Sequence, residues 1–292
     1  MSFHALALVL LAAALHAGWN YLAKSARNMA AFLWWAVFLG ALGYGGCLFL
    51  IEPVLLPRKV WGLYALSMGA EVGYLVMLVR GYELGDLSLV YPLARGAAPS
   101  LIAVWSALFL GERLPAPGYL GVALMVAGIL VVALRPRGAG EKRPHDGRGV
   151  RNAAIWALAA GFFVSVYSLL DKIIVRDVPP EVYNFWVYAG MAAGWSPFVW
   201  LGRRGAAGEN FAELGRNWGR ILIGMVMNVA GYWAILLALT ITSASYVLAA
   251  RGTSVVMGAL LGWLALKEAF GPVRVAGAAL MAGGLALVVL AR

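Results

Sequence analysis

Long apolar runs follow one another along the whole chain, and only short polar segments separate them. A helix needs about 20 mostly apolar residues to cross the hydrocarbon core of a bilayer. Ten runs reach that length and predict ten membrane helices, at 3–23, 31–51, 60–80, 87–110, 116–134, 152–172, 181–201, 218–238, 243–266 and 271–291. The first run has no Lys or Arg before it, so we interpret it as a membrane helix rather than a signal peptide. The pattern predicts an all-α integral membrane protein.

Composition supports a membrane as the solvent of this chain. Hydrophobic residues make up 63% of its 292 residues and charged residues 12%, whereas a soluble domain carries about 25% charged residues. The net charge of +10 does not indicate a nucleic-acid partner, because Lys and Arg fall at helix ends and in loops, where membrane topology places them. Cys47 is the only cysteine, which excludes an internal disulfide and a cysteine-based metal site.

The two halves of the chain are related by an internal repeat. An offset of 156 residues aligns Arg95-Gly96 with Arg251-Gly252. It also aligns Leu110, Glu112, Gly121, Met125 and Gly128 with Leu266, Glu268, Gly277, Met281 and Gly284. Each half holds five predicted spans, an odd number, so the halves should cross the membrane in opposite directions, as in many secondary transporters. We expect a first repeat at 1–134, a basic linker at 135–151 and a second repeat at 152–292.

Three motifs carry a resemblance to a known family. Two are the related segments Leu108-Phe109-Leu110-Gly111-Glu112-Arg113-Leu114 and Leu264-Ala265-Leu266-Lys267-Glu268-Ala269-Phe270, and the third is His16-Ala17-Gly18-Trp19-Asn20. With them, the chain resembles the EamA-type branch of the drug/metabolite transporter superfamily. The resemblance implies ten spans in two repeats and a central cavity lined by the first, third, fourth, sixth, eighth and ninth helices. It also implies carriage of small metabolites, amino acids or drug-like compounds, often outward.

Glu71 is an acidic residue inside a predicted span, and such residues usually face a cavity because they are costly in hydrocarbon. It lies ten residues after Trp61, about 15 Å along a helix and so near the membrane midplane. An offset of 157 pairs it with the neutral Asn228, so one carboxyl breaks the repeat. We predict that Glu71 couples transport to protons; the alternative is a structural ion pair with Arg95.

Arg95 and Arg251 lie about eight residues into their helices, or roughly 12 Å deep. If the halves are inverted, the two arginines approach the centre from opposite sides, and each guanidinium suits a carboxylate, sulfonate or phosphate. The alternative is that each arginine only holds the helix bundle together. His16 lies in the first span and is a candidate proton shuttle or a packing residue.

Other side chains complete the candidate site with aromatic and polar groups, which suit a pocket for organic solutes. They are Trp19, Asn20, Tyr74, Trp186, Asn228 and Tyr232. Lys24 corresponds to Lys172 in the repeat. We interpret Lys24 and Asp171-Lys172 as residues of helix ends, where lysines usually extend to the membrane interface.

These features predict a secondary transporter of small organic solutes in the bacterial inner membrane, working by alternating access and coupled to protons. The arginines favour metabolites, amino-acid-like or other anionic or zwitterionic compounds. The alternatives are an exporter of cationic or amphipathic drugs and a lipid flippase. No nucleotide-binding loop, embedded hydrolase triad or HExxH motif occurs, so we expect neither a cofactor nor an enzyme. Glycines in 116–134 and 271–291 permit close helix contact and a homodimer there.

The orientation in the membrane stays open at this point. Counting Lys and Arg by the positive-inside rule puts the linker at 135–151 in the cytoplasm and both termini outside. The family resemblance instead implies that both termini are cytoplasmic.

Overall fold

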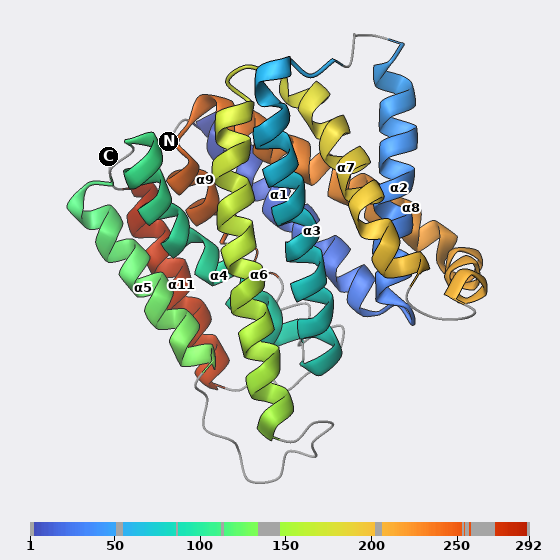
Figure 1. Ribbon diagram of the computed structural model, residues 1–292. Helices are drawn as coiled ribbons and strands as arrows, with labels where there is room; N and C mark the ends of the chain where they lie inside the picture. Colours follow the sequence, from blue (N-terminus) through green and yellow to red (C-terminus); the bar gives the residue numbers. More distant parts are fainter. Residues whose placement is uncertain are drawn as a thin grey trace.

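A computed structural model describes residues 3–50, 55–85, 87–111, 114–133, 147–201, 206–252, 254, 257 and 272–290. Each predicted span overlaps a described helix, although only the first part of the span 243–266 does so (Figure 1). The helices are α1 (Phe3–Lys24), α2 (Met29–Leu48), α3 (Trp61–Leu84), α4 (Leu87–Trp105), α5 (Ala116–Ala133), α6 (Gly147–Ile174), α7 (Pro180–Trp200), α8 (Ala206–Ile241), α9 (Ala244–Arg251) and α11 (Pro272–Leu290). Most of the predicted span 243–266 beyond Arg251 lies outside the described residues.

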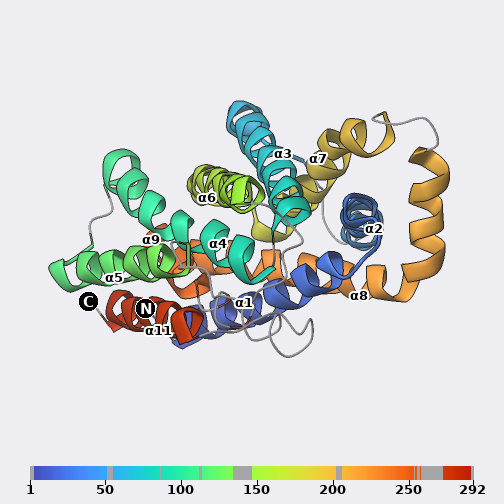
Figure 2. The ribbon, with the colours of Figure 1, turned by 90° about the horizontal axis from the view of Figure 1, so that it is seen from below.

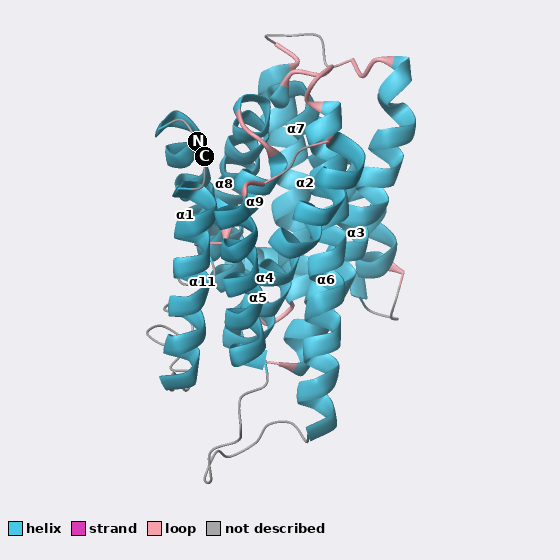
Figure 3. Ribbon diagram, turned by 90° about the vertical axis from the view of Figure 1, so that its left-hand side faces the viewer, coloured by secondary structure: helices cyan, strands magenta, loops and turns pink. Residues whose placement is uncertain are grey.

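Helices are the main regular structure, and the described residues contain no strand (Figure 3). Two short turns complete the described elements, the 3-10 turn η1 (Arg58–Val60) and the π-helical segment η2 (Ser106–Leu110). Six helices are long and apolar enough to cross a bilayer, at Phe3–Lys24, Met29–Leu48, Arg58–Leu84, Leu89–Leu110, Arg151–Ile174 and Ala207–Ile241. Shorter apolar stretches lie in α5 and α11. The chain is therefore a multi-pass membrane protein.

The helices form a bundle in which both halves contribute to the centre. The two termini lie close together at one end of the bundle, whereas α5 ends and α6 begins at the other end (Figure 1). Seen from below, α5 and α11 lie side by side at one edge, and α2 with the first segment of α8 lies at the opposite edge (Figure 2). Between these edges, α3 packs against α6 and α1 packs against α8, so the central core joins helices of both halves.

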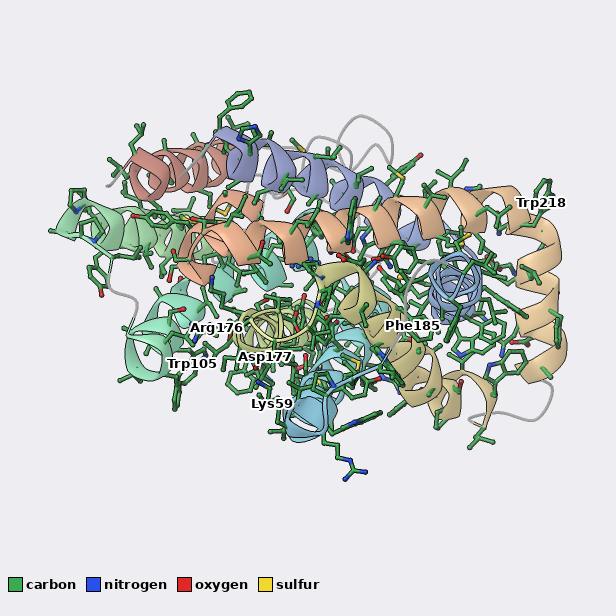
Figure 4. All side chains as sticks on the ribbon, turned by 90° about the horizontal axis from the view of Figure 1, so that it is seen from above. Lys59, Trp105, Arg176, Asp177, Phe185 and Trp218 are labelled. Atoms are coloured by element: carbon green, nitrogen blue, oxygen red, sulfur yellow. The ribbon has the colours of Figure 1, made fainter. Side chains whose placement is uncertain are left out.

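α8 begins twelve residues earlier than its predicted span of 218–238, at Ala206. Asn217 has non-helical dihedral angles (φ −121°, ψ 17°), and α8 bends sharply beside Trp218 (Figure 4). The segment before the bend is held to α2, because Trp35 Nε1 donates to the Asn210 carbonyl (3.0 Å) and the Asn28 backbone N–H donates to Glu213 Oε2 (3.2 Å). Sequence analysis missed this segment because its apolar side chains are too few for a membrane span.

Two lysines make equivalent contacts at the ends of α1 and α6. Lys24 Nζ donates to the carbonyls of Tyr82 (2.5 Å) and Gly85 (3.1 Å) at the end of α3. Lys172 Nζ donates to the carbonyls of Leu239 (2.6 Å) and Thr242 (2.8 Å) at the end of α8. The accepting residues differ by 157 positions in both cases, the offset that pairs Glu71 with Asn228. The extension of these lysines to the membrane interface stays a prediction, and in this structure each lysine binds helix-end carbonyls.

α5 and α11 approach each other through glycines. A Cβ atom on Gly121 would lie 2.5 Å from the Gly284 carbonyl oxygen, and one on Gly128 would lie 2.6 Å from that of Gly277. The glycine faces are thus used within one chain, as small residues commonly are between membrane helices. A homodimer through α5 and α11 stays a prediction and would have to use their outward faces.

A matched pair of substitutions on α11 tests this contact. Gly284→Leu should destabilise the protein by about 2 kcal/mol or more, because the side chain meets the backbone of α5. A Cβ atom on Gly283 would have no neighbour within 4 Å. Gly283→Leu gains the same helix propensity, so the Tm of this variant in detergent should not fall. Equal Tm values for the two variants would contradict the close α5–α11 contact.

Candidate functional site

A small cavity lies at the centre of the bundle and contains most of the predicted site residues. Its volume is about 20 Å³, enough for about one water molecule. Seven predicted residues line it, with side chains from six other positions: His16, Trp19, Glu71, Tyr74, Asn228, Tyr232 and Arg251, together with Leu33, Val37, Leu75, Tyr167, Tyr188 and Met191. Helices α2 and α7 therefore contribute to the wall together with α1, α3, α6, α8 and α9. The family resemblance also implies the fourth helix, but no described residue of α4 lines this cavity.

Two carboxyl groups meet at one side of the cavity. Tyr232 Oη lies 2.7 Å from Glu71 Oε1 and 2.5 Å from Asp171 Oδ2. Asp171 Oδ1 also accepts hydrogen bonds from Tyr183 Oη (2.6 Å) and Ser67 Oγ (2.9 Å). Both carboxyl side chains are 1% exposed. α3, α6, α7 and α8 are thus joined through one hydrogen-bonded cluster.

The alternative interpretation of Glu71, an ion pair with Arg95, is wrong for this conformation. Tyr232 is the hydrogen-bond partner of Glu71, and no ion pair joins Glu71 to Arg95 within the described chain. The carboxyl group of Glu71 is therefore held by a hydroxyl group, and the charge of Arg95 is left for another partner.

Asp171 is the main residue that sequence analysis missed. The sequence pattern places it at a helix end beside Lys172, but its side chain is buried in the cluster with Glu71. The sequence does contain a signal, because the apolar residues 173–175 follow Lys172. A carboxyl group with apolar residues on both sides of it belongs to the interior of the bundle rather than to the interface.

Arg251 and His16 form a contact between α9 and α1. Arg251 Nη2 lies 2.8 Å from His16 Nε2, and the imidazole packs edge-on against Trp19 with ring centroids 5.1 Å apart. A guanidinium group only donates hydrogen bonds, so the ring nitrogen that faces it must carry a lone pair. His16 is therefore neutral in this contact and leaves the charge of Arg251 uncompensated.

Arg95 is surrounded by tyrosines at the edge of the site. Its Nη2 donates to Tyr74 Oη (3.0 Å), and its guanidinium lies over the rings of Tyr74 and Tyr91. Arg95 Nη1 and the Nε and Nη1 atoms of Arg251 are buried and have no hydrogen-bond partner in the described part of the chain. Unpaired buried donors are costly, and more so when charged. An anionic acceptor would satisfy these three nitrogen donors.

The remaining predicted residues have different positions. Asn20 donates to the His16 carbonyl (2.7 Å) and accepts from Tyr82 Oη (3.1 Å), so it lies beside the cavity rather than on its wall. Asn228 Oδ1 accepts from Tyr188 Oη (2.9 Å) on the wall. Trp186 lies outside the lining residues, where it packs edge-on against Trp61 (ring centroids 5.3 Å apart).

A larger cleft opens near the ends of α1 and α3. Its volume is about 630 Å³, and its walls include Lys24, Asn28, Tyr82, Glu83 and Arg216. On its wall, Lys24 Nζ donates to the Gly85 carbonyl, and Tyr82 Oη donates to Asn20 Oδ1. The cleft lies at the helix ends, whereas the central cavity beside Asn20 is small.

The sequence of the second half matches a transporter family. The profile of the EamA-like transporter family matches residues 151–290. The spermidine export protein MdtI of Shigella flexneri is 37% identical over 79 residues, which are 26% of this chain and 69% of that protein. The chain belongs to the EamA-like transporter family. The predicted family is thereby confirmed.

Other relatives of this EamA-like chain are also transporters. The pseudopaline exporter CntI of Pseudomonas aeruginosa (strain UCBPP-PA14) is 27% identical over 241 residues, covering 81% of this chain and 72% of that protein. An uncharacterized transporter in the cobO 3′ region of Sinorhizobium sp is 35% identical over 83 residues, or 28% of this chain and 58% of that protein. The prediction that the chain is not an enzyme is confirmed by these relatives.

A solved structure shares the fold of the EamA-like chain. A crystal structure of a protein superposes with a TM-score of 0.67, over 99% of this chain and 97% of that chain. The sequence identity is 18%, so this likeness concerns the fold alone.

A double-mutant cycle tests the contact between Arg251 and His16. His16→Leu should lower the free energy of unfolding by about 2 kcal/mol, because it leaves another N–H of a buried guanidinium without an acceptor. Arg251→Leu combined with His16→Leu should cost less than the sum of the single changes, since contacting residues couple. The measurement is thermal or denaturant unfolding in detergent. Additive effects would contradict a direct bond.

Proposed function

We propose that this chain is a secondary transporter of small organic solutes that carry an anionic group, with amino-acid-like zwitterions as the favoured class. The observation that carries the proposal is the set of three buried guanidinium nitrogen atoms on Arg95 and Arg251 that have no hydrogen-bond partner among the described residues. A carboxylate, sulfonate or phosphate would supply the missing acceptors, because planar guanidinium donors match such groups. Placement in the bacterial inner membrane is part of the proposal.

The proposed architecture is ten membrane helices in two inverted repeats, at 1–134 and 152–292, with the basic linker 135–151 between them. The equivalent contacts of Lys24 and Lys172 support it, since their accepting carbonyls share the 157-residue offset. Repeats of this kind transport by rocking about a central site so that each end opens in turn. A cavity of about 20 Å³ is too small for an organic solute, so this conformation corresponds to a closed step of alternating access.

Protons are the proposed coupling ion, and Glu71 is the proposed coupling residue. Its carboxyl group lies on the cavity wall, near the residues that would bind the solute. The proposed partners are accordingly a small-molecule substrate, protons and the lipid bilayer.

Export of cationic solutes is a second candidate, favoured by the carboxyl groups of Glu71 and Asp171. The relative that is named a spermidine export protein supports this alternative. A polyamine has no anionic group for the arginines, so the two candidates make opposite predictions for Arg95 and Arg251.

Transport into proteoliposomes tests the substrate class. We expect the purified protein to move at least one labelled amino acid or dicarboxylate, and Arg251→Ala or Arg95→Ala to raise its KM about tenfold to hundredfold, through lost charged hydrogen bonds. Arg80→Ala is the matched control, because Arg80 is exposed and paired with Glu83. Transport of spermidine that survives both central substitutions would instead support the cation exporter.

A pH gradient across the same proteoliposomes tests coupling. Wild-type protein should accumulate its solute only with a gradient, whereas Glu71→Gln, which has no proton to exchange, should allow exchange of solute without gradient-driven accumulation. Accumulation by Glu71→Gln at the wild-type level would contradict the role of Glu71.

A further inference from the structure

We infer that Glu71, Tyr232 and Asp171 form a site that binds one proton, and that this proton and the anionic group of the solute bind together rather than in exchange. The second part rests on the proposed function, because it needs the anion site at Arg95 and Arg251. The first part rests only on the hydrogen-bond geometry of the cluster.

A count of hydrogens requires the proton. Tyr232 Oη lies within hydrogen-bond distance of both Glu71 Oε1 (2.7 Å) and Asp171 Oδ2 (2.5 Å). A phenol has one hydrogen to donate, and an ionised carboxylate only accepts. With both carboxyl groups ionised, one short contact would bring lone pairs together. One carboxyl group must therefore carry a proton and donate it to the phenol oxygen.

The surroundings of the two carboxyl groups decide which of them carries the proton. Asp171 accepts two further hydrogen bonds, from Ser67 and Tyr183, on its other oxygen. Hydrogen bonds to the charged form stabilise a carboxylate, and Glu71 has Tyr232 as its hydrogen-bond partner. Glu71 is therefore the acid, which donates to Tyr232, and Tyr232 in turn donates to the anionic Asp171.

Charge balance links this proton to the solute. Charged and titratable side chains face Glu71 from the helices around it and from its own helix. They are Asp171 and Tyr167 on α6, Tyr183 and Tyr188 on α7, Tyr232 on α8, Arg251 on α9, Arg95 on α4, His16 on α1 and Tyr74 on α3. With Glu71 protonated and His16 neutral, the two arginines face one anion, Asp171. An anionic solute group would neutralise the excess positive charge. If Glu71 lost its proton, its own negative charge would remove the excess positive charge and weaken the binding of the anion. Proton binding and anion binding should therefore strengthen each other.

Infrared spectroscopy of the purified full-length protein tests the proton site without any substrate. At neutral pH, wild-type protein should give the carbonyl band of a buried protonated carboxyl group. Glu71→Gln should remove this band, and the conservative control Glu83→Gln, on the same helix but exposed in an ion pair with Arg80, should retain it. Absence of the band in the wild type, or its persistence in Glu71→Gln, would overturn the assignment of the proton to Glu71.

Small ions test the link between the bound proton and the anionic group of the solute. In thermal-shift titrations, formate should bind the wild type several-fold more tightly at about pH 6 than at about pH 8, since the bound proton favours the anion. Methylammonium should show no such preference for low pH, and Glu71→Gln should bind formate equally at both. Formate binding that does not depend on pH in the wild type would overturn the linkage. No formate binding at either pH would contradict the anion site of the proposed function instead.

A second inference comes from the paired lysine contacts, which are independent of the charged centre. We propose that Lys24 and Lys172 are equivalent latches that close the two ends of the transport path. Each lysine ends the first helix of its half, and each binds two carbonyls at the end of the third helix of that half. Carbonyls at a helix C-terminus carry partial negative charge and attract a cation.

The latch contacts lie at opposite ends of the bundle. α1 ends beside the large cleft, where Lys24 lies on its wall, and α6 runs from that end toward the other (Figure 1). Both latches are closed in this structure, together with a nearly filled central cavity. Opening either end requires the tip of α3 or α8 to leave the lysine that holds it.

Cysteine labelling in detergent tests the latches in a Cys47→Ser background. Val79→Cys reports on the cleft side, and Leu236→Cys, 157 residues later and fully buried, reports on the other. Lys24→Met should raise the maleimide reaction rate of Val79→Cys about tenfold, the effect of losing bonds to a charged group, and lower that of Leu236→Cys. Lys172→Met should do the reverse, and Lys24→Arg should keep the wild-type rates. Equal increases at both reporters, or no change at either, would overturn the proposal.

Discussion

Charge in the middle of a membrane has to be compensated inside the protein, because hydrocarbon supplies neither water nor counterions. In this chain the hydrogen bonds that compensate the charged groups connect helices of both halves. Tyr232 on α8 joins Glu71 on α3 to Asp171 on α6, and Arg251 on α9 is bonded to His16 on α1. The centre of the bundle is therefore held by polar bonds whose partners are far apart in the sequence, while apolar contacts surround them.

The compensation is incomplete in one respect, on which the proposed function rests. The two carboxyl groups are linked through hydroxyl groups, whereas three buried nitrogen atoms of the arginines have no partner within the described residues. A purely structural core would have paired its opposite charges directly. Here the acidic groups and the basic groups lie on separate sides of a cavity lined by aromatic rings. A zwitterionic solute, or an anion together with a proton, would balance the charges of both sides.

The two halves of the chain match each other at the ends of the bundle but differ at its centre. At the ends of the bundle, the lysine contacts at the same 157-residue spacing support the proposed repeat. The centre departs from it, since Glu71 corresponds to Asn228 and Asp171 precedes Lys172 where Ala23 precedes Lys24. Symmetric ends suit two mouths that open in turn. An asymmetric centre suits a single site for one solute and one proton.

The sequence by itself determined the class of protein, the helices and the residues that do not belong in lipid, because hydrophobic length and embedded charge are local properties of the chain. Most members of the candidate site were named on that basis, and Glu71, Arg251 and His16 do meet at one cavity. Only the tertiary structure decided which side chains form hydrogen bonds with each other. Asp171 lies near a helix end by sequence, yet the bundle carries it to Glu71. The first segment of α8 precedes a bend at Asn217 that the hydropathy pattern does not predict. Which side chains form hydrogen bonds depends on how the tilted helices cross. The hydropathy pattern along the sequence does not specify those crossings.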